Sequence, residues 1–149
     1  MQGYVRPIAL AVIQRKRDGA LLVFEGYDPH KEEAFYRPLG GTIEFGEPGI
    51  QAVQRELYEE TGLRLQNVHY LATLENIFTY DGQTGHEIVL LYRAHLSDAA
   101  AQVYEQEAIP VVEDSGQRYT GRWMPLSRFG HGGPPLYPTG LLELLCGNE

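Results

Sequence analysis

Cysteine is almost absent from this chain: Cys146 is the single one, so no intramolecular disulfide can form. Long apolar runs are also absent, and no stretch is long enough to span a bilayer. Arg6 and Pro7 interrupt the first apolar stretch, which leaves the N-terminus without the apolar core of a secretory signal peptide. These absences predict a soluble protein of a reducing compartment, and we expect it to be cytoplasmic.

Positive charge is scarce as well. The chain has 12 Lys and Arg residues against 20 Asp and Glu residues, a net charge of −8. This balance argues against nucleic acid or an anionic membrane as a partner bound through bulk charge. The basic run from Arg15 to Arg17 precedes Asp18 and Gly19, and it predicts a solvated hairpin turn. A polyanionic small molecule must therefore be met by local cations or by a bound metal ion.

Several common site motifs are missing. The histidines, at positions 30, 69, 86, 95 and 131, lack the spacing of zinc ligands. The chain contains no phosphate-binding P-loop, no EF-hand loop and no Ser/His/Asp arrangement. Histidines in such scattered positions are expected to have structural or surface roles.

The 149 residues suit one domain, residues 1–149, that buries about two-thirds of its unfolded surface. Apolar runs, turn residues and helix caps predict strands at Ile8 to Gln14 and Ala20 to Tyr27 that pair with each other, a helix at Pro48 to Thr61, one or two strands at Leu65 to Thr79, a turn at Tyr80 to Gly85, strands at His86 to His95 and Tyr119 to Met124, and a helix at Thr139 to Cys146. Ala99 to Gln106 fits either a short helix or an extended segment. Strands before and after a helix, with a final helix, predict an α/β fold with a mixed sheet covered on both faces.

The most informative segment reads GTIEFGEPGIQAVQRELYEETGL, from Gly41 to Leu63. Pro48 is a good first-turn helix residue, and Gly62 can supply a left-handed C-terminal cap. The segment places five glutamates around this one short helix: Glu44, Glu47, Glu56, Glu59 and Glu60.

One face of this helix is apolar. Ile50, Val53 and Leu57 form a stripe that we expect to face the core. Ala52 projects on the carboxylate side, one turn earlier, where its small side chain would leave room for a ligand.

The adjoining face carries three carboxylates. Glu56, Glu59 and Glu60 fall within an arc of about 100°, so their like charges repel and at least one pKa should be raised in the absence of a cation. A hard divalent cation would remove this conflict, and glutamate oxygens favour Mg²⁺ or Mn²⁺ over zinc. Arg55, four residues before Glu59, has the spacing to pair with that carboxylate. A solvated acidic helix face is the competing interpretation of an isolated Glu-x-x-Glu-Glu.

The complete spacing resembles the signature box of the Nudix hydrolases, with every position filled from Gly41 to Leu63. The flanking segments Phe35 to Gly41 and Arg122 to Leu126 are also similar to strands of that family. The resemblance implies an α/β/α sandwich with a mixed β-sheet and a site at the loop-helix-loop formed by the box. It also implies a metal-dependent pyrophosphohydrolase that cleaves the diphosphate linkage of a nucleoside diphosphate derivative.

The same resemblance implies roles for individual residues. Glu56 and Glu60 are the first metal ligands, followed by Glu59, with the Gly40 carbonyl as a backbone ligand and Arg55 as the orienting group. Glu44 and Glu47 are expected to support them. A further glutamate outside the box often acts as ligand or base in the family, and four candidates stay open: Glu75, Glu87, Glu107 and Glu113. Glu113 and Glu87 are the stronger two because of their places before the Trp123 strand and beside the hairpin turn.

Substrate residues are expected at Arg37, which could contact phosphate, and at Phe78 and Tyr80, which could stack on a base. Tyr80 lies seventeen residues beyond Leu63, where family members that resemble dinucleoside polyphosphate hydrolases carry tyrosine. Dinucleoside polyphosphates and nucleoside di- or triphosphates therefore rank above ADP-ribose. We expect a small-molecule nucleotide as partner and a possible homodimer. The alternatives are a nucleotide-sensing module without turnover and a purely structural cation site.

Overall fold

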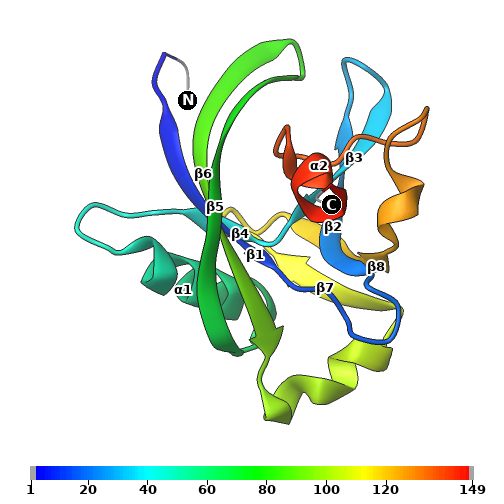
Figure 1. Ribbon diagram of the computed structural model, residues 1–149. Coiled ribbons are helices and arrows are strands. Elements are labelled where there is room, and N and C mark those ends of the chain that lie inside the picture. The colour runs from blue at the N-terminus through cyan, green and yellow to red at the C-terminus, as the bar shows by residue number, and fades with distance from the viewer. Residues whose placement is uncertain (1–2, 148–149) are drawn as a thin grey trace.

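The computed structural model describes residues 3–147, and its strands form two four-stranded sheets (Figure 1). The first sheet, in the order β4-β1-β6-β5, contains β1 (Arg6–Val12), β4 (Gly40–Thr42), β5 (Leu65–Tyr80) and β6 (Gln83–Leu96). The second sheet, in the order β3-β2-β8-β7, contains β2 (Leu21–Asp28), β3 (Glu33–Pro38), β7 (Ala108–Val112) and β8 (Arg118–Met124). The helices are α1 (Gly49–Thr61), α2 (Leu141–Cys146) and the 3₁₀ helices η1 (Asp98–Glu105) and η2 (Leu126–Arg128).

The expected α/β class with a mixed sheet is confirmed, because β1 runs parallel to β6 while its other neighbour, β4, is antiparallel. The expected pairing of the first two strands is wrong. β1 and β2 belong to different sheets and are joined by a bridge between Gln14 and Leu21. The reason is that both edges of β1 pair with later segments, β4 on one side and β6 on the other, which leaves no edge for β2.

The alternating side chains of β1 supply two separate cores. Ala9 and Ala11 belong to the core that includes Val53 and Leu57 of α1. The residues that alternate with them on the strand, Ile8, Leu10 and Val12, belong to the core that includes Leu141 of α2. Because neighbouring strand residues point to opposite faces, α1 and α2 cover opposite sides of the strands, as Figure 1 shows around β1 and β6. The result is the layered sandwich that the sequence predicts.

The boundaries of α1 agree closely with the sequence. Pro48 is the N-cap residue, and Gly62 adopts the left-handed conformation (φ 76°) with its N–H donated to the Tyr58 carbonyl. Two expectations about the faces of α1 are wrong. Ile50 is 39% exposed because it lies in the first turn, beyond the edge of the core, and Ala52 is fully buried in the α1 core, so it does not leave room for a ligand.

The second half of the chain differs from expectation in the length of its elements. Strand β5 continues to Tyr80 and strand β6 begins at Gln83, so the turn expected at Tyr80 to Gly85 consists of Asp81 and Gly82 alone. Both turn residues have positive φ (51° and 77°), a conformation that matches the twist of a tight hairpin. The segment left open between helix and extended chain is the 3₁₀ helix η1. Among the described residues, none of the helices has the length and apolar content needed to cross a membrane.

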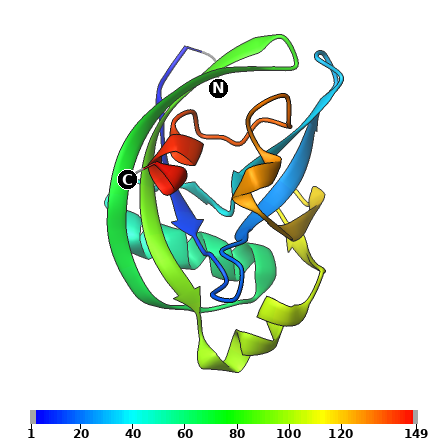
Figure 2. The same ribbon diagram turned by 45° about the vertical axis from the view of Figure 1, so that its right-hand side comes forward.

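Asp28 joins the tips of two hairpins, one from each sheet. Its buried carboxylate accepts hydrogen bonds from the backbone N–H groups of His30 (3.0 Å) and Lys31 (3.3 Å) in the β2–β3 loop and of Asp81 (3.0 Å) in the β5–β6 turn. Burial by itself raises the pKa of Asp28, but these donors outweigh that effect and the pKa is lowered. Figure 2 shows the tip of the long β5–β6 hairpin beside the β2–β3 loop. The two sheets are therefore tied together at this end of the molecule.

Candidate metal and nucleotide site

Glu56 lies against the double-glycine strand that precedes α1. A Cβ atom on Gly41 would lie 2.5 Å from the Glu56 carboxyl carbon, so the carboxylate occupies the space that any other residue would fill. Gly40 is equally constrained: its φ is 148°, and a Cβ there would lie 2.1 Å from the Ala9 carbonyl oxygen. The two glycines thus allow the helix carboxylate to approach the strand backbone, including the Gly40 carbonyl region expected to supply a ligand.

Arg55 connects three glutamates and the backbone of β4. Its Nε and Nη2 atoms donate to the two Glu47 carboxylate oxygens at 2.7 and 2.9 Å, and Nη2 also donates to the Thr42 carbonyl at 3.0 Å. Its Nη1 donates to Glu56 at 3.1 Å and to Glu59 at 3.2 Å. The expected pair with Glu59 is therefore present, but it is one part of a larger clamp. The planar guanidinium suits this task because its donors point in fixed directions.

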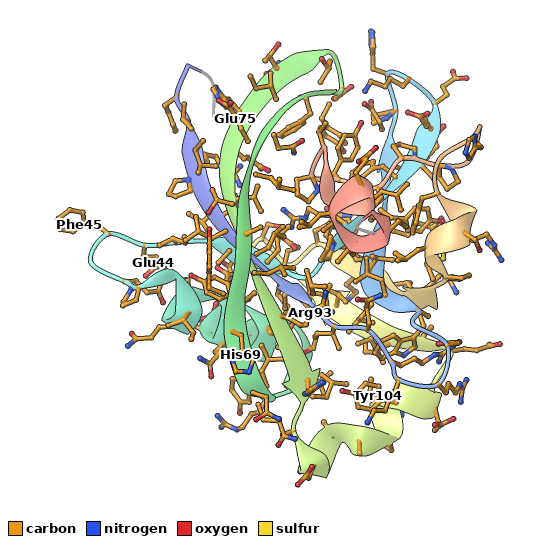
Figure 3. All side chains as sticks on the ribbon, in the orientation of Figure 1. Glu44, Phe45, His69, Glu75, Arg93 and Tyr104 are labelled. Atoms are coloured by element: carbon orange, nitrogen blue, oxygen red, sulfur yellow. The ribbon has the colours of Figure 1, made fainter. Side chains whose placement is uncertain are left out.

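Glu47 anchors the clamp from the loop before the helix. Besides Arg55, its Oε1 accepts the Glu44 backbone N–H at 3.0 Å. The hydrogen bonds from Arg55 and from the Glu44 backbone lower the pKa of Glu47, while Glu47 raises the pKa of Arg55. Figure 3 shows Glu44 and Phe45 at the tip of the loop between β4 and α1, directed away from both sheets. Glu47 thus supports the site through Arg55, and the Glu44 side chain is exposed.

Glu60 faces Glu113 of the loop between β7 and β8. Burial raises the pKa of Glu60 to about 9, and the neighbouring charge and hydrogen bond of Glu113 add to the shift, while Arg37 opposes it. Burial likewise raises the pKa of Glu56, against the influence of Arg55. The raised pKa expected among the helix carboxylates is therefore present, but its largest cause is burial and not the repulsion between neighbouring glutamates.

Asp114 is the acidic residue that sequence reasoning missed. One oxygen each from Glu56, Glu59 and Asp114 lies within 4.8 Å of the others. The signal available in the sequence was the pair Glu113-Asp114 at the start of a turn, but nothing there indicates which member faces the helix. Three carboxylates from two separate segments make an oxygen donor set that fits a hard divalent cation such as Mg²⁺ or Mn²⁺.

A cleft of about 280 Å³ opens between the two sheets, and it reaches the carboxylates through Glu113, which lines it and contacts Glu60. Arg37, Phe78 and Tyr80, the residues expected to contact substrate, all line it together with Glu113. The Arg37 guanidinium carbon lies 5.0 Å from the centre of the Phe24 ring. Its Nε atom is buried and makes no hydrogen bond among the described residues, which leaves this donor for a bound anion.

The structure distinguishes among the four glutamates outside the box that are candidates for a further ligand or base. Glu113 lies beside Glu60, whereas Glu87 is buried in another part of the cleft, 3.7 Å from Arg6. Glu75 is exposed and pairs with His86 at 2.8 Å, and Glu107 is exposed. Glu113 is therefore the one of the four that lies against the helix carboxylates.

By its fold the protein is an α/β sandwich of two sheets, with a carboxylate cluster at the edge of the cleft between them. Residues 5–139 match the model of the NUDIX domain, so the chain belongs to the NUDIX family. The resemblance of the segment from Gly41 to Leu63 to the Nudix box is thereby confirmed.

Curated relatives match over shorter segments. The NAD-capped RNA hydrolase NudC of Pasteurella multocida is 38% identical over 66 residues, which cover 44% of this chain and 25% of that protein. The RNA pyrophosphohydrolase of Aeromonas hydrophila is 37% identical over 71 residues, covering 48% of this chain and 38% of that protein. The chain thus spans well under half the length of each of these two relatives.

Solved structures show the same fold over most of the chain. The MutT NUDIX hydrolase from Burkholderia pseudomallei superposes with a TM-score of 0.65 at 24% identity, covering 96% of this chain and 98% of that one. A NUDIX hydrolase from Nitrosomonas europaea gives a TM-score of 0.54 at 18% identity, with coverage of 83% and 74%. These likenesses show the fold, and the family match supports a hydrolase of pyrophosphate bonds.

Proposed function

We propose that the protein is a metal-dependent pyrophosphohydrolase that cleaves the diphosphate linkage of a nucleoside diphosphate derivative. The observation that carries this proposal is the cluster of Glu56, Glu59 and Asp114 oxygens, together with a partly aromatic cleft that is lined by Glu113, the residue before Asp114. A carboxylate cluster alone is compatible with a structural cation. A cleft next to it, lined by an arginine with a free buried donor, is what a phosphorylated substrate requires.

Each group of residues has a distinct task in this proposal. Glu56, Glu59 and Asp114 would hold Mg²⁺ or Mn²⁺, with Glu60 and the Gly40 carbonyl as further candidate ligands. When bound, the ion neutralises the diphosphate charge and lowers the pKa of water. Arg55 fixes the direction of the Glu56 and Glu59 carboxylates, and Arg37 donates to a substrate phosphate oxygen.

The pair of Glu60 and Glu113 provides the proton acceptor. Two carboxyl groups in contact readily retain one proton between them, because ionising both would place a second negative charge in a buried site. A cation held by Glu56, Glu59 and Asp114 would favour the fully ionised pair, and a carboxylate oxygen of Glu113 can accept a proton from the attacking water. The reaction breaks one P–O bond of the anhydride and forms one P–O bond to the water oxygen, giving two phosphorylated products.

We rank dinucleoside polyphosphates and nucleoside di- or triphosphates as the first substrates to test. A cleft of about 280 Å³ lies near the lower end of the usual range for small-molecule sites, about 300–1,000 Å³. Two of the relatives, an NAD-capped RNA hydrolase and an RNA pyrophosphohydrolase, add NAD-capped RNA and RNA with a terminal pyrophosphate linkage to the panel. Their common feature is a phosphoanhydride next to a nucleoside.

The deciding experiment is incubation with Mg²⁺ and this panel, followed by product analysis. Release of a nucleoside monophosphate or of pyrophosphate supports the proposal. Saturable nucleotide binding without any product favours the alternative, a nucleotide-sensing module with a Nudix fold. If the protein shows no nucleotide binding and no turnover, a structural cation site is the interpretation that remains.

Divalent cations should raise the melting temperature. An ion that binds the folded protein alone stabilises it by mass action, by about 2.7 kcal/mol at a hundredfold excess over its Kd. Thermal melts in chelator and in millimolar Mg²⁺, Mn²⁺ or Ca²⁺ measure this shift, and Ca²⁺ should stabilise but support turnover poorly because its coordination is less strict. Asp114→Asn should shrink the shift. Identical melts with and without ions would exclude a preformed site.

Tyr80 should contribute to substrate binding through its ring. The ring is 45% exposed, lines the cleft and packs edge-on against Phe35 at 5.9 Å. Stacking on a base contributes about 1–3 kcal/mol, so Tyr80→Ala should raise KM about tenfold while Tyr80→Phe preserves it. Tyr70→Ala is the matched control, because Tyr70 lies on the same strand and is 60% exposed. Equal KM values for wild type and Tyr80→Ala would remove Tyr80 from the site.

A further inference from the structure

Glu87 is a buried carboxylate in the cleft for which the proposed chemistry has no use. It lies on β6, is 5% exposed and lines the cavity between the sheets. Arg6 of β1 pairs with it in register and lies 3.7 Å from its carboxylate, so a compensating positive charge is at hand. Arg6 thus provides the pairing that a buried acidic side chain requires, and the position of Glu87 in the cleft lining makes its carboxylate available to a ligand as well.

The register of β1 separates Glu87 from the carboxylate cluster. On this strand Ala9 lies opposite Gly41, the glycine next to the Glu56 carboxylate, whereas Arg6 lies opposite Glu87. Three residues along a strand correspond to about 10 Å. A nucleotide whose phosphates lie at Arg37 and the cluster therefore has its sugar between the two places and its base near Glu87.

Aromatic rings surround the part of the cleft where the base would lie. Phe35 packs edge-on against Tyr80 and against Tyr137, each at 5.9 Å, and Phe78 lies 6.3 Å from Tyr137. All four rings line the cavity. Such rings supply faces for stacking, which is tolerant of sequence because every base has a π-face. Stacking gives affinity, and the choice among bases must come from a polar group.

Asp28 and Glu87 are the buried carboxylates among the described residues that line the cleft, and because Asp28 already accepts three backbone N–H groups, Glu87 is the one that can make this choice. Asn76 lies opposite Glu87 on the neighbouring strand β5. Its Oδ1 already accepts hydrogen bonds from the Thr139 N–H (3.0 Å) and hydroxyl (3.1 Å). An ionised carboxylate offers acceptors alone, so it requires donors from the base. Guanine presents two adjacent donors on one edge, N1–H and the 2-amino group, and can engage both carboxylate oxygens. Adenine and cytosine offer one amino group next to a ring acceptor, and uracil one N–H between two carbonyls.

We propose that Glu87 determines base specificity and that the cleft selects guanine nucleotides through a bidentate contact between its carboxylate and the N1–H and 2-amino groups. This inference rests on the proposed function for the orientation of the nucleotide. Arg6 orients the carboxylate from the neighbouring strand, and the aromatic rings hold the plane of the base. The contact adds selectivity to a phosphate site that is itself indifferent to the base.

Binding of nucleoside monophosphates tests the proposal apart from turnover, because they contain no anhydride to cleave. Calorimetric titration in Mg²⁺ should give a Kd for GMP about tenfold or more below that for IMP, which differs in lacking the 2-amino group. AMP, CMP and UMP should bind more weakly than GMP. If no substrate is hydrolysed but this order holds, the proposed function fails and the specificity stands.

Glu87→Gln should abolish the difference between GMP and IMP, since its amide NH₂ opposes one of the two donors. Glu75→Gln is the matched control: Glu75 is exposed on the neighbouring strand, and Figure 3 shows it on the side of the β5–β6 hairpin away from β2 and β3. Equal Kd values for GMP and IMP in the wild type, or a preference that survives in Glu87→Gln, would overturn the proposal. The wild-type comparison decides even if Glu87→Gln melts too low for titration.

Discussion

Glu60→Gln is expected to lower turnover by about a hundred- to a thousandfold while the metal-free protein remains folded. The substitution removes a negative charge that the site needs for a cation and for the shared proton with Glu113, and such electrostatic contributions amount to several kcal/mol in the transition state. It leaves a side chain of almost the same shape in the same buried place. Initial rates on the best nucleotide of the panel, with saturating Mg²⁺, give the effect.

The control for this variant is Glu75→Gln, which removes a charge from an exposed glutamate paired with His86. It should retain wild-type turnover. Near-normal turnover in Glu60→Gln would remove Glu60 from both the ligand set and the proton-accepting pair.

The same variant should alter the pH dependence of stability. Because burial and Glu113 raise the pKa of Glu60 in the folded protein to about 9, above the ordinary 4.5, the folded state holds this proton more tightly than the unfolded chain. The stabilisation that this proton gives to the folded state is fully present below pH about 4.5. It is lost as the pH rises toward 9, and the free energy of unfolding falls by at most about 1.4 kcal/mol per pH unit. In chelator, the wild-type melting temperature should therefore fall between pH 5 and 9, and that of Glu60→Gln should fall less. Parallel curves would show that Glu60 is ionised in the folded protein over this range.

Arg55→Lys should weaken the metal site although it keeps the positive charge. Lysine cannot reproduce the fork that joins Glu47, Glu56, Glu59 and the Thr42 carbonyl, so the carboxylates lose their common orientation. Loss of groups that orient metal ligands typically costs about 10- to 100-fold in metal affinity or activity. Titration of turnover with Mg²⁺ would reveal this as a higher half-saturating concentration and a lower maximum.

Arg64→Lys is the matched control for Arg55→Lys. Arg64 follows α1, is exposed and lies over the Tyr58 ring at 4.4 Å, away from the clamp. It should behave as wild type. A Mg²⁺ titration of Arg55→Lys that coincides with that of Arg64→Lys would mean that the glutamates hold their positions without the clamp.

The parts of the site that could be predicted from the sequence are those contained in one short segment. The caps Pro48 and Gly62, the buried Val53 and Leu57, and the spacing of Arg55 from Glu59 all follow from helical geometry. Most of the other segments could also be recognised as strands, from their apolar residues and from the turn residues that bound them. These properties depend on neighbours within a few residues.

Properties that depend on distant segments could not be predicted in this way. Asp114 joins Glu56 and Glu59 because the β7–β8 loop folds over α1, and a one-residue difference in that loop decides whether Glu113 or Asp114 faces a given carboxylate. Ile50 is exposed because the core ends before the first helical turn, which periodicity cannot reveal. The assignment of β1 and β2 to different sheets likewise depends on partners that arrive later in the chain.

The two faces of β1 have unequal tolerance for evolutionary change. Ala9 and Ala11 separate the strand from the helix that carries Glu56, and a larger side chain at either position would push α1 outward and draw the carboxylate away from Gly41. Leu10 and Val12 face α2, whose aliphatic residues can repack around a changed volume. Homologous sequences should therefore drift freely among aliphatic residues on the α2 side while retaining small residues beneath the acidic helix.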